Sequence, residues 1–328
     1  MKYYNLLFSF TLIISTLISI SSNSWMGMWL GLEINLLSII PLMNSSKNPL
    51  SSEASIKYFI TQALASIILL FSVILMSQNL NELMILIYNS SLLTKLGSAP
   101  FHFWFPEVLE GLSWLNCTIM LTWQKITPMI MITYNFSSNY FFFCIIVMNM
   151  LISGFMGMNQ VSLRKIMAYS SINHIGWMLS SMYFMETIWF LYFSIYTILT
   201  LLIVWIFNKM GFLYLSQLTS FSKNKFSNKL FLSMNFLSLG GLPPFIGFLP
   251  KWMTIQSLII NKLYMLTFIM VISTLITLFF YIRLIMNFMT INLTTLKFHI
   301  NQIQNTNFSF NFIFLMGISF LTLSINLF

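Results

Sequence analysis

The sequence predicts an all-α, polytopic membrane protein with about eleven transmembrane helices. Apolar residues make up 58% of its 328 residues, charged residues make up only 6%, and the mean hydropathy is +0.85. A soluble domain carries roughly 25% charged residues, so this composition excludes a soluble enzyme. The apolar residues form runs long enough to cross a hydrocarbon core of roughly 30 Å. These runs lack the period-2 alternation of a membrane barrel, which leaves helices as the structure that satisfies the backbone in lipid.

Eleven apolar runs are expected to span the membrane within a single transmembrane domain, 1–328. They cover approximately residues 4–20, 25–43, 58–76, 83–105, 112–134, 140–157, 166–184, 187–208, 231–260, 264–288 and 308–328. The first run has the length of a signal peptide, but no small-residue cleavage motif follows it. We therefore expect it to be the first span.

Basic residues in the connections predict the orientation. With alternate connections assigned to opposite faces, the N-terminal side holds Lys2, Lys47, Arg164, Lys165, Lys209, Lys223, Lys225, Lys229 and Lys297, with Lys57 and Arg283 at helix ends facing the same way. By the positive-inside rule, this side is expected to face the inner compartment, with the C-terminus outside. The net charge of +9 therefore reflects membrane orientation. Because the basic residues are scattered singly, no nucleic-acid partner is expected.

The sequence offers few residues that could hold a cofactor. Its two cysteines, Cys117 and Cys144, are too few for a Cys-ligated cluster or zinc site. The three histidines, His102, His174 and His299, show no metal-binding pair, and no glycine-rich nucleotide motif occurs. We expect no metal and no cofactor on this chain.

Two of the apolar runs contain matching interruptions. Residues 97–106 and 241–250 share a glycine, a Pro-Phe pair three and four positions later, and a proline nine positions later. Each lies in the fourth span of a five-helix set, which predicts two inverted repeats, 1–135 and 140–290, and an additional helix at 308–328. Broken helices in corresponding positions of inverted repeats are typical of a transport pathway. The alternative is two ordinary proline kinks.

Five ionisable residues fall where the membrane is expected to be driest. Glu33 and Lys125 lie near the middle of their spans, Lys95 and Lys251 flank the two interruptions, and His174 is central in the seventh span. A charged residue at the centre of a span costs roughly 2.5 to 3.5 kcal/mol on insertion scales. Such residues mark an ion or proton path. The alternatives are lysines that snorkel to an interface and a packed core histidine.

The other ionisable residues near the spans are expected to be interfacial. His102 and Glu107 lie near the end of the fourth expected span, and Glu53, Glu110 and Lys262 lie near connections. We expect no proton-relay role for these five residues.

Eight short motifs carry a resemblance to a known family. They are Gly-Leu-Glu-Ile-Asn at 31–35, Lys-Leu-Gly at 95–97, Ala-Pro-Phe-His-Phe-Trp at 99–104, Trp-Gln-Lys at 123–125, Leu-Arg-Lys at 163–165, Ser-Ser-Ile-Asn-His at 170–174, Gly-Gly-Leu-Pro-Pro at 240–244 and Gly-Phe-Leu-Pro-Lys-Trp at 247–252. From about residue 20 to 290 the chain closely resembles the subunit 2 family of mitochondrial NADH:ubiquinone oxidoreductase, respiratory complex I. Beyond residue 290 it departs from that pattern.

The resemblance implies an antiporter-like, proton-translocating subunit of the inner mitochondrial membrane, with its N-terminus in the matrix and its C-terminus in the intermembrane space. It implies contacts with other membrane-arm subunits and with phospholipids, cardiolipin being a candidate. By motif, Glu33 and Lys95 match the family's Glu-Lys pair, Lys125 its central lysine, Lys251 the lysine of the second broken helix, and His174, more weakly, a histidine of the hydrophilic axis. NADH, FMN, iron-sulfur clusters and ubiquinone are implied to belong to other subunits.

Two other functions fit the same residues. A stand-alone cation/proton antiporter would share the inverted repeats and the buried lysines. A structural spacer of the membrane arm would leave the pumping to its neighbours.

Overall fold

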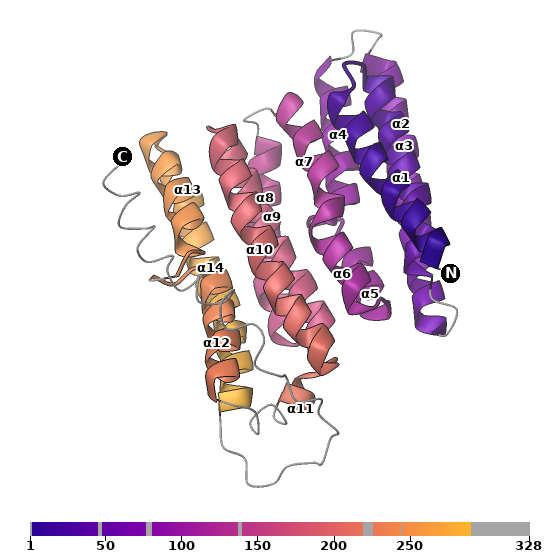
Figure 1. The fold of residues 1–328 in the computed structure, drawn as a ribbon. Helices are drawn as coiled ribbons and strands as arrows, with labels where there is room; N and C mark the ends of the chain where they lie inside the picture. The colour runs from indigo at the N-terminus through magenta and orange to yellow at the C-terminus, as the bar shows by residue number, and fades with distance from the viewer. Residues whose placement is uncertain are drawn as a thin grey trace. The chain divides into compact units, whose positions relative to one another are not determined.

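The computed structural model describes residues 2–44, 48–76, 81–136, 140–218, 226–243 and 245–289. In these ranges the chain is built from helices and separates into two compact units, Met1–Ile145 and Ile146–Phe328 (Figure 1). Six of the described helices are long and apolar enough to cross a membrane. The expected eleventh span, 308–328, lies outside the described residues, so the full count stays a prediction.

The first unit is a bundle of helices that neighbour one another in the chain (Figure 1). Its helices are α1 (Lys2–Ser21), α2 (Trp25–Met43), α3 (Pro49–Met76), α4 (Asn81–Leu96), α5 (Trp104–Gly111), α6 (Trp114–Leu121) and α7 (Trp123–Tyr134). Helix α2 packs against α1 and α3, α3 also packs against α4 and α5, and α7 contacts α4 and α6. Helix α3 is therefore a shared wall for both halves of the interrupted segment, α4 and α5.

The second unit surrounds one buried helix. Helix α8 (Tyr140–Met158) leads into it, followed by α9 (Leu163–Met182), α10 (Glu186–Met210), α11 (Leu215–Leu218), α12 (Phe226–Gly240), α13 (Phe248–Ile260) and α14 (Tyr264–Met289). All but two of the residues of α9 are buried, and it contacts α10, α13 and α14. Because side chains pack on every face of α9, its polar residues meet protein rather than lipid.

Two of the sequence-based boundaries are wrong. The third span was expected from residue 58, but α3 begins at Pro49, because a proline in the first turn of a helix removes no hydrogen bond that the helix would make. Lys57 therefore lies inside α3 and not at a helix end. The fifth span, 112–134, is not continuous, since α6 and α7 are separated at Thr122. Thr122 has φ −116° and ψ −69°, a φ far from the helical value of about −63°, and its hydroxyl bonds the carbonyl of Thr118 at 2.7 Å.

Helices α1 and α2 approach each other closely at Gly31. A Cβ added there would lie 2.7 Å from the Cβ of Ser19 and 2.8 Å from its main-chain nitrogen. Small residues at such crossings let two membrane helices pack backbone against backbone. The main chain of Ser19 cannot rotate away as a long side chain could.

Gly31→Ala is therefore expected to push α1 away from α2 and to cost about 1 to 3 kcal/mol of stability, as overpacking does. Thermal unfolding of the assembled complex, and the amount of subunit recovered in it, would measure this effect. Gly240→Ala is the matched control, because a Cβ there meets nothing closer than 3.7 Å. Equal losses in both variants would contradict the close approach at Gly31.

Candidate functional site

The first helix of each interrupted segment, α4 in one and α12 in the other, ends in the same way. Helix α4 stops before Gly97 (φ 70°) and α12 stops before Gly241 (φ 75°). In each case the glycine N–H bonds the carbonyl three residues back, and the next N–H bonds the carbonyl five residues back, which is the Schellman pattern. Helical structure resumes at Trp104 in α5 and at Phe248 in α13.

This ending leaves main-chain carbonyls of the last helical turn without a helical donor. In the second unit, the Lys251 ammonium meets that need. Its Nζ donates to the carbonyl of Gly240 at 2.8 Å and to that of Leu239 at 3.2 Å, and it lies 5.7 Å from the ring centroid of Trp177. Lys251 is buried. The negative end of the α12 dipole therefore faces a lysine from the first turn of α13.

His174 lies in the same unit, on the buried helix α9. Its Nδ1 lies 2.8 Å from the hydroxyl oxygen of Tyr192 on α10. The two side chains line a small cavity together with Tyr196, Leu239 and Pro250, among others. Since Leu239 also accepts a hydrogen bond from Lys251, the second unit brings His174 to the neighbourhood of the α12–α13 interruption.

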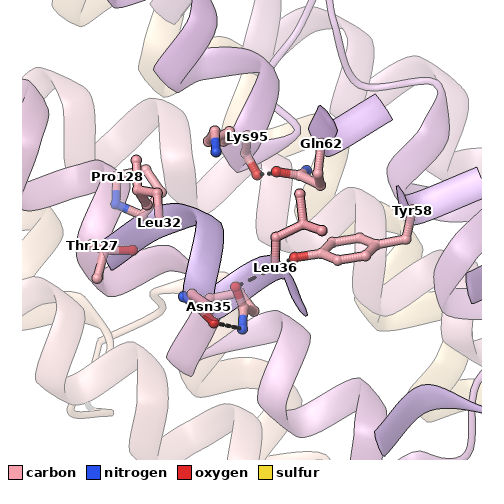
Figure 2. A pocket seen from close by; sticks show the side chains of 9 residues that line it. Leu32, Asn35, Leu36, Tyr58, Gln62, Lys95, Thr127 and Pro128 are labelled. Atoms are coloured by element: carbon pink, nitrogen blue, oxygen red, sulfur yellow. Dashed lines mark hydrogen bonds between the residues drawn. The ribbon is translucent and has the colours of Figure 1, made fainter. Parts of the chain in front are cut away.

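In the first unit, a side-chain amide occupies the corresponding place. The Gln62 amide on α3 donates to the main-chain carbonyl of Lys95 at 3.4 Å. Lys95 is the second-last residue of α4 and is buried. Its side chain lines a cavity with residues of α2, α3 and α7 (Figure 2). The space open to the centre of a water molecule there is about 10 Å³, which is room for about one water.

Hydrogen bonds between side chains from three helices fix one wall of this cavity (Figure 2). The Gln124 amide on α7 donates to the Asn35 side-chain oxygen on α2 at 2.8 Å. The Tyr58 hydroxyl on α3 donates to the Gln124 side-chain oxygen at 3.5 Å. Amides that are held in this way keep one orientation.

The structure brings three of the five predicted relay residues into the first unit. Lys125 on α7 is 1% exposed, and its Nζ lies 5.7 Å from the ring centroid of Phe105. Glu33 on α2 lies in the same unit as Lys95, but within the described residues no direct ion pair joins them. The Oε1 atom of Glu33 is buried and has no hydrogen-bond partner in the described part of the chain.

An ion-pair cluster that was not predicted from the sequence links α3 to α5. The Lys57 ammonium lies 2.8 Å from a Glu107 carboxylate oxygen and 2.9 Å from one of Glu53. The three side chains are partly exposed, so the pairs contribute little stability. Instead of being separate interfacial residues, Lys57 and Glu107 link α3 to α5, the helix that follows the first interruption.

The polar wall residues were also missed, although the sequence carries a signal for them. Helix α3 places polar residues at three- to four-residue spacing, at Ser51, Ser55, Tyr58, Gln62 and Ser66, all of them buried. A polar stripe of this spacing in a lipid-spanning helix predicts one face turned toward protein.

Within the described ranges, no group of three or more His, Cys, Asp or Glu side chains is placed to hold a metal ion.

Solved structures share this fold. A chain of respiratory complex I from Thermus thermophilus superposes with a TM-score of 0.84 at 19% identity, covering 96% of this chain and 78% of that one. A chain of the Mrp complex from Dietzia sp. gives a TM-score of 0.80 at 17% identity, covering 87% and 60%. The chain is therefore an all-helical membrane protein of antiporter-like fold.

Comparisons of sequence identify the family to which the chain belongs. The family model described as NADH:quinone oxidoreductase/Mrp antiporter, TM, matches residues 22–277. NADH-ubiquinone oxidoreductase chain 2 of Anopheles gambiae is 50% identical over 97% of this chain and 96% of the relative, and that of Lemur catta is 38% identical over 89% of each. The chain belongs to the NADH:quinone oxidoreductase/Mrp antiporter transmembrane family and, within it, to the group of NADH-ubiquinone oxidoreductase chain 2 sequences.

Gly241 touches the Lys251 side chain so closely that a substitution should displace the ammonium. A Cβ at Gly241 would lie 2.6 Å from Cδ and 2.9 Å from Nζ of Lys251. Gly241→Ala is expected to lose the bonds from Lys251 to the end of α12, which a map of the variant would reveal. Gly211→Ala is the matched control, because Gly211 has a similar φ of 67° but open space around it. Both variants should lose stability from backbone strain, but only Gly241→Ala should move Lys251.

Proposed function

We propose that this chain is a proton-translocating membrane subunit of mitochondrial NADH:ubiquinone oxidoreductase, respiratory complex I. Relatives named as chain 2 of that enzyme align with almost the whole of this chain. In this proposal the chain lies in the inner mitochondrial membrane beside other membrane-arm subunits and phospholipids, including cardiolipin. It carries no redox chemistry, and NADH, FMN, iron-sulfur clusters and ubiquinone are held by other subunits.

The observation that carries this proposal is the burial of lysines beside interrupted helices in an apolar chain. Lys95 and Lys125 are buried in one unit and Lys251 in the other. A lysine in dry surroundings is costly to keep charged, and a nearby carboxylate favours the charged form. We assign the proton-relay role to Glu33, Lys95, Lys125 and Lys251, with His174 as a weaker member.

The energies involved are large enough for this task. Moving a lysine between dry surroundings and the reach of a carboxylate changes its preference for a proton by roughly 4 to 7 kcal/mol. Carrying one charge against a potential of 100 mV takes about 2.3 kcal/mol. A Glu33–Lys95 interaction that strengthens and weakens would therefore drive uptake and release of one proton. Redox energy from the other subunits would supply the switching.

The finer architecture is part of the same proposal. We infer eleven spans arranged as two inverted five-helix repeats, 1–135 and 140–290, with an additional helix at 308–328. The interrupted segments α4–α5 and α12–α13 are the two broken helices of that scheme. The shared spacing of Gly, Pro-Phe and Pro in 97–106 and 241–250 supports this inference. The glycine ending alone does not, because α10 ends in the same hydrogen-bond pattern at Gly211.

A stand-alone cation/proton antiporter is the second candidate, and the fold shared with a chain of the Mrp complex favours it. Ion exchange by the purified chain in vesicles would support the antiporter. A structural spacer is the third candidate. It requires that Lys125→Met leave the proton yield per NADH unchanged in the assembled complex.

The relay is tested by Glu33→Gln, Lys95→Met and the double variant. Each single change is expected to lower NADH-driven proton uptake, since one removes the acidic partner and the other the proton site. The double variant should lose less than the sum of the two losses, because residues that act as a unit are not additive. The measurement is acidification of proteoliposomes that contain the assembled complex.

Lys262→Met is the control for this series, because Lys262 is an exposed lysine in the turn between α13 and α14. It should pump as the parent does. Strictly additive losses, or full pumping by Lys95→Met, would mean that Glu33 and Lys95 do not form a functional unit.

The proposed orientation places residue 2 in the matrix and the turn at Lys262 in the intermembrane space. The excess of basic residues in the connections on the N-terminal side supports it. Tags inserted at these two positions should be labelled from opposite sides of sealed mitochondrial membranes. Labelling of the residue 2 tag from the intermembrane space would refute the orientation.

A further inference from the structure

We propose that the cavity beside Lys95 binds one water molecule, and that Thr127 is a positioning residue that holds this water against the Lys95 ammonium. The inference rests on the proposed function, because it names the group that receives the proton of Lys95. It also assigns a role to a residue that carries no charge.

The first observation is an unpaired hydroxyl. Thr127 on α7 is 1% exposed and lines the cavity, and its Oγ1 has no hydrogen-bond partner among the described residues. Other hydroxyls in these helices bond a carbonyl one turn back, as Thr133 does to Ile130 at 2.7 Å and Ser38 to Asn35 at 2.8 Å. A buried hydroxyl without such a bond calls for an additional partner.

The second observation is a main-chain acceptor at the same place. Pro128 lies inside α7 and has no N–H, so the carbonyl of Gln124, four residues earlier, lacks its helical donor. Gln124 and Pro128 both line the cavity. The proline thus leaves the Gln124 carbonyl without its usual helical donor, one turn before the unpaired Thr127 hydroxyl.

The third observation is the shape and lining of the cavity. Figure 2 shows Thr127 and Pro128 on one side, Tyr58 and Gln62 on the other, and Lys95 and Asn35 between them. The open space of about 10 Å³ fits one water, and an internal water needs two to four polar partners. Thr127, Gln124 and Lys95 supply them, while the bonded amides of Asn35 and Gln124 keep the wall rigid.

The chemistry of this site is a single proton transfer. As an N–H bond of the Lys95 ammonium breaks, the nitrogen keeps the electron pair and the water oxygen takes the proton. The products are a neutral amine and a hydronium ion. The Thr127 oxygen and the Gln124 carbonyl accept hydrogen bonds from that hydronium ion, so both favour proton release from Lys95.

The test compares three variants in the assembled complex. Thr127→Val keeps the shape and removes the hydroxyl, Thr127→Ser keeps the hydroxyl, and Thr133→Val removes a hydroxyl of the same helix that is already bonded within it. We expect Thr127→Val to slow NADH-driven proton pumping roughly tenfold, the change that loss of one hydrogen bond of ordinary strength produces, and to alter its solvent deuterium isotope effect. Thr127→Ser should restore both, and Thr133→Val should change neither.

A map of the parent complex that resolves waters supplies an independent measurement. One water is expected within hydrogen-bond distance of Thr127 Oγ1, and it should be missing from Thr127→Val. A dry cavity in the parent, or normal pumping by Thr127→Val, would overturn the inference. Lys95→Met separates the two levels: if it stops pumping while Thr127→Val does not, only the water site is wrong, whereas normal pumping by Lys95→Met refutes the relay itself.

Discussion

The structure depends on the need of every main-chain polar group in the hydrocarbon for a partner. Each interrupted segment ends a helix inside an apolar unit and so exposes carbonyl oxygens. The second unit satisfies them with the Lys251 ammonium, and the first satisfies the carbonyl of Lys95 with the Gln62 amide. A helix break is therefore stable only together with the polar side chain that closes it. The unpaired carbonyls at each break and the buried polar side chain that bonds them therefore stabilise one another.

The two units share the same helix ending, but the lysine beside it lies in different surroundings in each. In the first, the lysine precedes the break and borders a polar cavity with Asn35 and Gln124. In the second, the lysine follows the break and is itself the cap, with His174 and Tyr192 nearby. A proton leaving Lys251 would weaken the cap of α12, whereas a proton leaving Lys95 would leave the Gln62 bond intact. Charge and helix geometry are thus coupled more directly at Lys251.

The helices and the glycine endings could be predicted from the sequence, because apolar run length and Gly-Pro spacing are local properties of the chain. The cavity wall could not. Its hydrogen bonds join residues 66 and 89 positions apart, Tyr58 to Gln124 and Gln124 to Asn35, and the Lys57–Glu107 pair spans 50 positions. Such partners are set by which helix faces meet. The break at Thr122 was not predicted, because hydroxyls that bond a carbonyl four residues back also occur in continuous helices, as at Thr61 in α3 and Ser273 in α14.

The burial of α9 has a consequence for the biogenesis of the protein. This helix carries Arg164, Lys165, four serines, Asn173 and His174, and it is not among the described helices apolar enough to span a membrane by themselves. It gains little from contact with lipid and much from contact with its neighbours. Helix α9 should therefore leave the insertion machinery together with α10, Glu186–Met210, which is apolar enough to partition alone. A polar helix of the second unit would thus enter the bilayer only together with a more apolar neighbour.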